Sequence, residues 1–248
     1  MKTVSFNQGP RVLVVDDHRI SRLHTVQALR QVLGHVKQAR TAQEAMHTAL
    51  KQLPELIFID VHLGDVHLGD VDSGDACGLS LVERLRQSWP SQCPFPAIVV
   101  VTGDNSNSMR QKLEQASVSA VLLKPVQSER IREITVQLLQ LDRAVRENPG
   151  QDTPEAAESG MRKIFLEELN IRLPELDRHI SSLEWDSARH ILHQLIASSA
   201  LCREKDLELH CRKLFNALEK KPQPQALAQA YFPFRQVLAR IMIPGQAA

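Results

Sequence analysis

The 248-residue chain is long enough for two ordinary domains, and its 43% apolar fraction is typical of a soluble globular protein. Thirty basic and twenty-nine acidic side chains nearly cancel, which argues against nucleic acid or an anionic membrane as a partner selected by overall charge. Four scattered cysteines lack metal-site spacing and disulfide-scaffold density, and no apolar run reaches membrane-spanning length. We therefore expect a reduced, cytoplasmic protein without membrane insertion.

The first 145 residues alternate short β-branched runs with helical patterns. The predicted strands are RVLVVDD, a weak one near Val36, LIFID, AIVVVTG and AVLLKP. Predicted helices lie at about 19–33, at 78–87 and from about residue 128. Continuous apolar strands alternating with helices are typical of a parallel sheet covered on both faces. The pattern predicts an α/β domain with a doubly wound sheet over residues 10–145.

A second, all-α domain is predicted after a linker. In the stretch RENPGQDTPEAAESG, residues 146–160, apolar periodicity stops and Pro, Gly, Glu and Ser dominate, as in solvated linkers. Over residues 161–243, apolar residues recur at intervals of three and four, which indicates amphipathic helices with short connections. We expect an antiparallel four-helix bundle there.

Polar side chains follow four of the predicted strands. Asp16 and Asp17 follow the first strand, Asp60 ends the third, Thr102 the fourth, and Lys124 the fifth. Any one of them alone would be an ordinary solvated loop residue, but the carboxyl ends of parallel strands share one edge of the sheet, where functional groups gather. Three carboxylates crowded there repel one another, so a hard divalent cation such as Mg²⁺ is the expected partner.

The strings VLVVDD, LIFID, VVVTG and LLKP together resemble the receiver domain of bacterial two-component response regulators, over about residues 10–145. The resemblance implies a flavodoxin-like fold with five parallel strands, in which Asp60 is the phosphoacceptor and Thr102 and Lys124 contact the phosphoryl group and carry a conformational switch. It also implies a Mg²⁺ site formed by Asp16 through water, Asp17, Asp60 and the backbone carbonyl of His62. Positioning and charge neutralisation are what phosphoryl transfer requires.

Two features depart from the receiver pattern. Val121 stands where receivers usually carry an aromatic residue of the switch, three positions before the lysine. The pentad VHLGD is repeated, so Gly78 lies eighteen residues after Asp60 instead of the usual eight. The excess, Val66–Asp75, is either an acidic flap beside the site or replication slippage tolerated in a surface loop, and slippage is the favoured interpretation.

In the helical half, HQLIASSA followed by LELHC is similar to the histidine phosphotransfer (HPt) domain, over about residues 160–243. The resemblance implies that His193, on the outward face of its helix, accepts phosphoryl groups. The usual lysine, glycine and later glycine are replaced by Ile196, Ala197 and Arg203. Arg189, one helical turn before His193, is a hypothetical substitute for the lysine charge.

Together these patterns predict a cytoplasmic phosphorelay protein in which Asp60 is phosphorylated from a hybrid sensor histidine kinase and the bundle relays phosphoryl groups through His193. Other receiver or HPt proteins are the further expected partners, and no enzymatic activity is expected beyond phosphoryl transfer and hydrolysis at Asp60. The alternative is a degenerate bundle that docks on a sensor kinase and modulates it without phosphotransfer. Direct DNA binding is not expected, since no basic recognition helix is recognisable.

Overall fold

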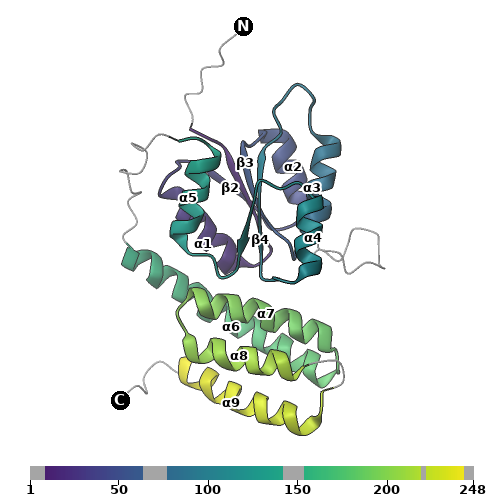
Figure 1. The fold of residues 1–248 in the computed structure, drawn as a ribbon. Coiled ribbons are helices and arrows are strands. Elements are labelled where there is room, and N and C mark those ends of the chain that lie inside the picture. Colours follow the sequence, from purple (N-terminus) through teal and green to yellow (C-terminus); the bar gives the residue numbers. More distant parts are fainter. Residues whose placement is uncertain (1–8, 64–76, 142–153, 219–221, 243–248) are drawn as a thin grey trace. The chain divides into compact units, whose positions relative to one another are not determined.

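The computed structural model describes residues 9–63, 77–141, 154–218 and 222–242. The repeated segment Val66–Asp75 lies outside these residues, so neither interpretation of it is tested. The chain divides into two compact units, Met1–Asp152 and Thr153–Ala248. The first unit is an α/β sandwich and the second consists of helices (Figure 1).

The first unit is built on a five-stranded parallel sheet in the order β2-β1-β3-β4-β5. Its strands are β1 (Val12–Val15), β2 (Val36–Ala39), β3 (Leu56–Asp60), β4 (Ala97–Thr102) and β5 (Ala120–Leu123). Val12 pairs with Val36 on one side and with Leu56 on the other, and Leu56 pairs with Ala97. The three central strands are almost wholly buried, which explains why they read as continuous apolar runs.

Helices cover both faces of this sheet (Figure 1). One face carries α1 (Arg19–Arg30) and α5 (Ser128–Leu138), and the other carries α2 (Ala42–Gln52), α3 (Cys77–Ser88) and α4 (Asn107–Gln115). Successive strand residues point to opposite faces, so Val12 and Val14 join the core under α1 and α5, whereas Leu13 and Val15 join the core under α2, α3 and α4. The predicted doubly wound α/β fold is confirmed.

The second unit contains α6 (Pro154–Ser181), α7 (Trp185–Leu201), α8 (Lys205–Ala217) and α9 (Pro224–Met242). Each helix packs on the next one along the chain. The buried stripes that face one another include Phe165, Leu169, Leu176, Ile191, Leu192, Leu195, Leu207, Leu214, Phe234 and Leu238. The predicted helical half is therefore confirmed, and its arrangement is consistent with a helical bundle.

One boundary differs from the sequence expectation. The predicted linker ends at residue 160, but α6 already begins at Pro154. Proline is favoured at the first position of a helix, and the Glu and Ala residues that follow it are good helix formers. The polar composition that indicates a linker is therefore compatible with the first two turns of a helix.

The chain has two tryptophans, and each unit holds one of them. Trp89 directly follows α3, donates its indole N–H to the carbonyl of Pro94 at 3.0 Å, and packs edge-on against Phe95. Trp185 is the first residue of α7. In the part of the chain that the structure describes, no helix combines the length and apolarity needed to cross a membrane.

Candidate functional site

Three carboxylates meet at the carboxyl edge of the sheet. Asp16 and Asp17 directly follow β1, and Asp60 is the last residue of β3, the strand that pairs with β1. One carboxylate oxygen from each of the three lies within 4.8 Å of the others. Asp16 and Asp60 are buried and Asp17 is half-buried, so their mutual repulsion is only weakly screened by water.

Lys124 supplies a positive charge to this cluster from the end of β5. Its ammonium lies 2.7 Å from Oδ2 of Asp60 and 3.1 Å from Oδ2 of Asp16. The peptide bond between Lys124 and Pro125 is cis. Burial by itself would lower the pKa of Lys124, but the two carboxylates outweigh it and raise the pKa. Lys124 is therefore a permanent cation at this edge.

One ammonium does not compensate the whole cluster. Burial raises the pKa of Asp16 above its ordinary value; Lys124 opposes this shift and Asp60 adds to it. The backbone N–H of His18 donates to Oδ1 of Asp16 at 2.8 Å, which fixes the carboxylate in place. The cluster offers carboxylate oxygens, which are hard ligands, and its negative charges outnumber the one positive charge of Lys124. Such a set of ligands fits Mg²⁺. Asp16, Asp17 and Asp60 are the residues that would hold the ion.

The remaining predicted residues surround the cluster. Thr102 ends β4 and is fully buried, and its backbone carbonyl accepts the N–H of Lys124 at 2.7 Å. The Thr102 hydroxyl accepts the N–H of Asp104 at 3.0 Å. His62 lies two residues beyond Asp60 and donates its backbone N–H to Oδ1 of Asp60 at a long 3.4 Å. The structure therefore brings all the predicted residues of the first unit to one edge.

Arg22 belongs to this site although the sequence reasoning missed it. It is buried on α1, and its Nη1 donates to the backbone carbonyl of Asp16 at 2.6 Å and to that of Asp17 at 3.3 Å. The guanidinium thus holds the main chain of the acidic pair. An arginine on the buried face of the helix that follows two acids was the available signal, because such a residue is rarely buried without partners.

Gly78 fixes the chain beyond Asp60 from the other side. A Cβ atom at Gly78 would lie 2.1 Å from the carbonyl oxygen of Asp60 and 2.8 Å from Cα of Val61. The Gly78 N–H also donates to the carbonyl of Val61 at 2.9 Å. The start of α3 therefore packs directly on the backbone of the central carboxylate, and only glycine allows this approach.

In the second unit, His193 lies on α7 opposite the buried stripe. Its ring is half-buried, as are Arg189, Ile196 and Ala197, whereas the facing stripe of Ala188, Ile191, Leu192, Leu195 and Ser199 is buried. Phe215 on α8, which the sequence reasoning missed, lies beside His193 with 6.4 Å between ring centroids. No pattern within α7 could reveal it, because the contact depends on how α7 and α8 pack.

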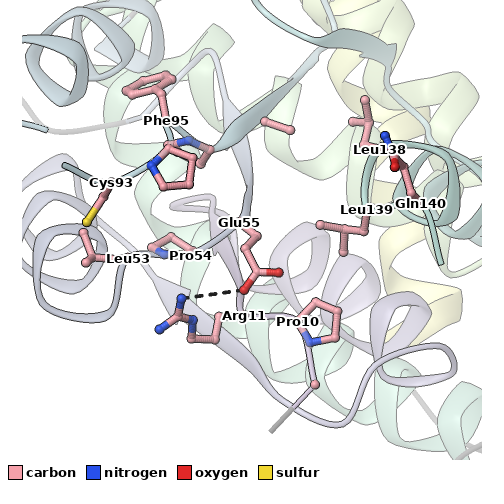
Figure 2. A pocket seen from close by; sticks show the side chains of 14 residues that line it. Pro10, Arg11, Leu53, Pro54, Glu55, Cys93, Phe95, Leu138, Leu139 and Gln140 are labelled. Carbon is pink, nitrogen blue, oxygen red and sulfur yellow. Dashed lines mark ion pairs between the residues drawn. The ribbon is translucent and has the colours of Figure 1, made fainter. Parts of the chain in front are cut away.

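A separate cavity of about 870 Å³ opens at the amino ends of β1, β3 and β4, the opposite edge of the sheet from the acid cluster. Leu53 and Phe95 line one side of it and Leu139 the other (Figure 2). Arg11 and Glu55 form an ion pair at the wall of this cavity, with 3.6 Å between Nη2 and Oε1 (Figure 2). The cavity contains none of the predicted site residues.

Comparison with known proteins gives a family and several structural relatives. A family model described as the response regulator receiver domain matches residues 12–136. A CheY-like receiver domain protein from Methanospirillum hungatei is 24% identical, with 53% of this chain and 94% of that chain covered and a TM-score of 0.44. The receiver domain of AraT, a response regulator from Geobacillus stearothermophilus, is 25% identical, with 53% and 93% covered and a TM-score of 0.43.

A third similar structure is the receiver domain of NtrX from Brucella abortus, which is 21% identical, with 53% of this chain and 99% of that chain covered and a TM-score of 0.44. The family match spans half of the chain, from the first residue of β1 into α5. It encloses the three clustered carboxylates and Lys124. The chain belongs to the family of two-component response regulator receiver domains.

Proposed function

We propose that this protein accepts a phosphoryl group on Asp60 with Mg²⁺ and exchanges phosphoryl groups through His193 of the helical unit. The observation that carries the first step is the convergence of three carboxylates within 4.8 Å of one another, with the Lys124 ammonium at 2.7 Å from Asp60. A hybrid sensor histidine kinase is the proposed donor, other receiver or phosphotransfer proteins are the further partners, and the proposed compartment is the cytoplasm.

In the first step, a carboxylate oxygen of Asp60 attacks phosphorus. An O–P bond forms, the donor's bond to phosphorus breaks, and its electron pair leaves with the donor. Mg²⁺ held by Asp16, Asp17 and Asp60 would supply positive charge for the phosphoryl oxygens. Lys124 neutralises charge on the same group. The Arg22 guanidinium holds the backbone of Asp16, and the Gly78 N–H holds the carbonyl of Val61, next to Asp60. Thr102 is the proposed hydroxyl contact to the phosphoryl group and, with Lys124, carries the switch.

Phosphorylation of Asp60 is tested on the full chain with magnesium and acetyl phosphate. Intact-mass measurement should show one added phosphoryl group, lost with EDTA and lost in Asp60→Asn. Asp186→Asn, which removes an exposed acid on α7, is the matched control and should behave as the wild type. Unmodified wild-type protein, or equal labelling of Asp60→Asn, would contradict the proposal.

The second step requires an accessible imidazole. His193 is half-buried and lies on the face of α7 opposite the buried stripe, which supports its assignment as an imidazole that a partner can reach. Ala197, one turn further along α7, is small enough for a partner to approach closely. A neutral imidazole nitrogen is nucleophilic near pH 7.

The assay for His193 uses a phosphorylated receiver as donor and looks for phosphate that is labile to acid and stable to base. His193→Gln should abolish this signal. His190→Gln, which changes an exposed histidine one turn earlier, should retain it. If wild type and His193→Gln give the same signal, the bundle does not transfer phosphoryl groups, and docking on a sensor kinase becomes the better explanation of the helical unit.

A further inference from the structure

Three side chains in the second unit form a compact group that joins α7 to α8. The guanidinium carbon of Arg189 lies 4.3 Å from the centroid of the Phe215 ring. The imidazole of His193 lies against the same ring, with centroids 6.4 Å apart and planes inclined at 47°. Arg189 and His193 are four residues apart on α7, so they are neighbours on one helix face. Phe215 therefore contacts both the cation and the imidazole.

The position of the Arg189 guanidinium is fixed by two contacts. Its stacking on Phe215 is a cation–π contact. Its Nη1 also donates to the carbonyl of Leu218 at 3.3 Å, at the carboxyl end of α8, where the helix dipole favours a cation. A planar guanidinium held in this way has lost much of the rotamer freedom that ion binding would otherwise cost.

We propose that Arg189 binds the phosphoryl group carried by His193 and that Phe215 holds its guanidinium ready for that contact. The proposal rests on the proposed acceptance of phosphoryl groups by His193. A phosphoryl group adds between one and two negative charges near pH 7, and a guanidinium matches its oxygens with parallel N–H donors. A cation one helical turn from the imidazole lies within reach of that charge.

The bonds in the transfer step balance without a further reagent. The imidazole nitrogen that carries no hydrogen attacks phosphorus and forms an N–P bond. The bond from phosphorus to the donor breaks, and its electron pair leaves with the aspartyl carboxylate of a phosphorylated receiver or with the ammonia of phosphoramidate. The second ring nitrogen then gives up its proton to solvent. Arg189 stabilises the phosphoryl oxygens throughout and exchanges no proton.

The test uses the full chain with Asp60→Asn, so that the receiver does not compete, and phosphoramidate as donor. The readout is the initial rate at which phosphohistidine appears, followed by ³¹P NMR. Arg189→Gln keeps a side chain of similar shape without the charge and should slow the reaction about tenfold, the effect of losing one charge-assisted contact. Arg189→Lys restores the charge without the planar, stacked fork of donors and should recover part of the rate. Arg212→Gln, an exposed arginine on α8, should react as the parent does.

Phe215→Leu provides a second measurement that keeps the cation and an apolar neighbour. It removes the ring face and should give an intermediate rate, with the helical circular dichroism of the parent. A parent-like rate for Arg189→Gln, or an equally slow rate for Arg189→Lys, would overturn the role of Arg189. If the parent protein gains no phosphohistidine at His193, the proposed function is overturned instead. The parent protein alone gives this result, so it is distinguished from a failure of the role of Arg189.

Discussion

His24 shows how one half-buried side chain links the first unit to pH. It lies on α1, and its Nε2 is 3.0 Å from the hydroxyl of Ser128 at the start of α5. Burial lowers the pKa of His24 below its ordinary value of 6.5, and Glu129 opposes the shift only in part. The folded state therefore favours the neutral imidazole, which holds α1 and α5 together.

We predict that this histidine makes the first unit less stable in acid. A folded pKa below the unfolded value means that the stabilisation is complete above pH 6.5 and is lost as the pH falls through the folded pKa. Urea unfolding at about pH 7.5 and about pH 5.5 should show a smaller loss of unfolding free energy in His24→Gln than in the wild type. His47→Gln, an exposed change on α2, should leave the difference unaltered.

Arg203 has a backbone conformation that is unfavourable for a residue with a side chain. It follows α7 with a φ of 60°, in the left-handed region that favours glycine. The resemblance to phosphotransfer domains led us to expect a glycine at this position, and the left-handed backbone gives a physical reason for one.

Arg203→Gly should therefore stabilise the helical unit by about 0.5–1 kcal/mol, because relief of left-handed strain exceeds the added entropy of the unfolded chain. Urea unfolding followed by helical circular dichroism measures this. Arg212→Gly, which places glycine inside α8, is the control and should destabilise the unit by about 1 kcal/mol. Equal destabilisation by both changes would contradict the assignment of strain to Arg203.

At the scale of elements, the strands that are most buried were the easiest to predict from the sequence. The strands β1, β3 and β4 could be predicted because both of their faces are buried, which leaves an unbroken apolar signal. The edge strand β2 has only one buried residue, so its signal is weak. Helices α2 and α4 were not predicted, although Thr41 and Ser106 cap their amino ends by accepting the N–H groups of Glu44 and Met109.

The same contrast holds for the candidate site. The three carboxylates, Thr102 and Lys124 could be predicted because a topological rule places strand ends together. Arg22 was missed although its place on the buried face of α1 is a signal in the sequence, and Phe215 could not be predicted because its contact with His193 is set by tertiary packing. Sequence periodicity tells which face of a helix is buried, but not which residue of another element it meets.

The contact between α3 and β3 yields a prediction at this scale. Gly78→Ala places a methyl group against the main chain of Asp60, and neither backbone can move without disturbing the acid cluster. We expect a loss of about 1–3 kcal/mol of stability, as for other overpacked sites, together with slower phosphorylation of Asp60. Gly34→Ala has open space around its Cβ and serves as the control. Normal stability and labelling of Gly78→Ala would show that the contact is looser than described.

For the whole molecule, the division into two units predicts separate responses to ligand. Magnesium should bind the acid cluster of the first unit and leave the helical unit unaffected. A ligand at a hundred times its Kd stabilises its own folding unit by about 2.7 kcal/mol. Differential scanning calorimetry should therefore show two unfolding transitions, and magnesium should raise the midpoint temperature of only one of them.

Asp17→Asn removes a carboxylate of the cluster and should abolish the magnesium-dependent shift while both transitions remain. Arg203→Gly should shift the midpoint temperature of the helical unit's transition alone, which identifies that transition. A single transition, or equal movement of both by magnesium, would mean that the two units unfold as one.

The placement of one indole in each half makes the protein its own pair of optical labels. Trp89 lies beside Phe95 in the α/β half, and Trp185 starts the helix that carries His193. A Trp185→Phe variant would have indole emission only from the half that holds Asp60, and a Trp89→Phe variant only from the half that holds His193. Events in each half can thus be timed separately by fluorescence, without attaching a dye.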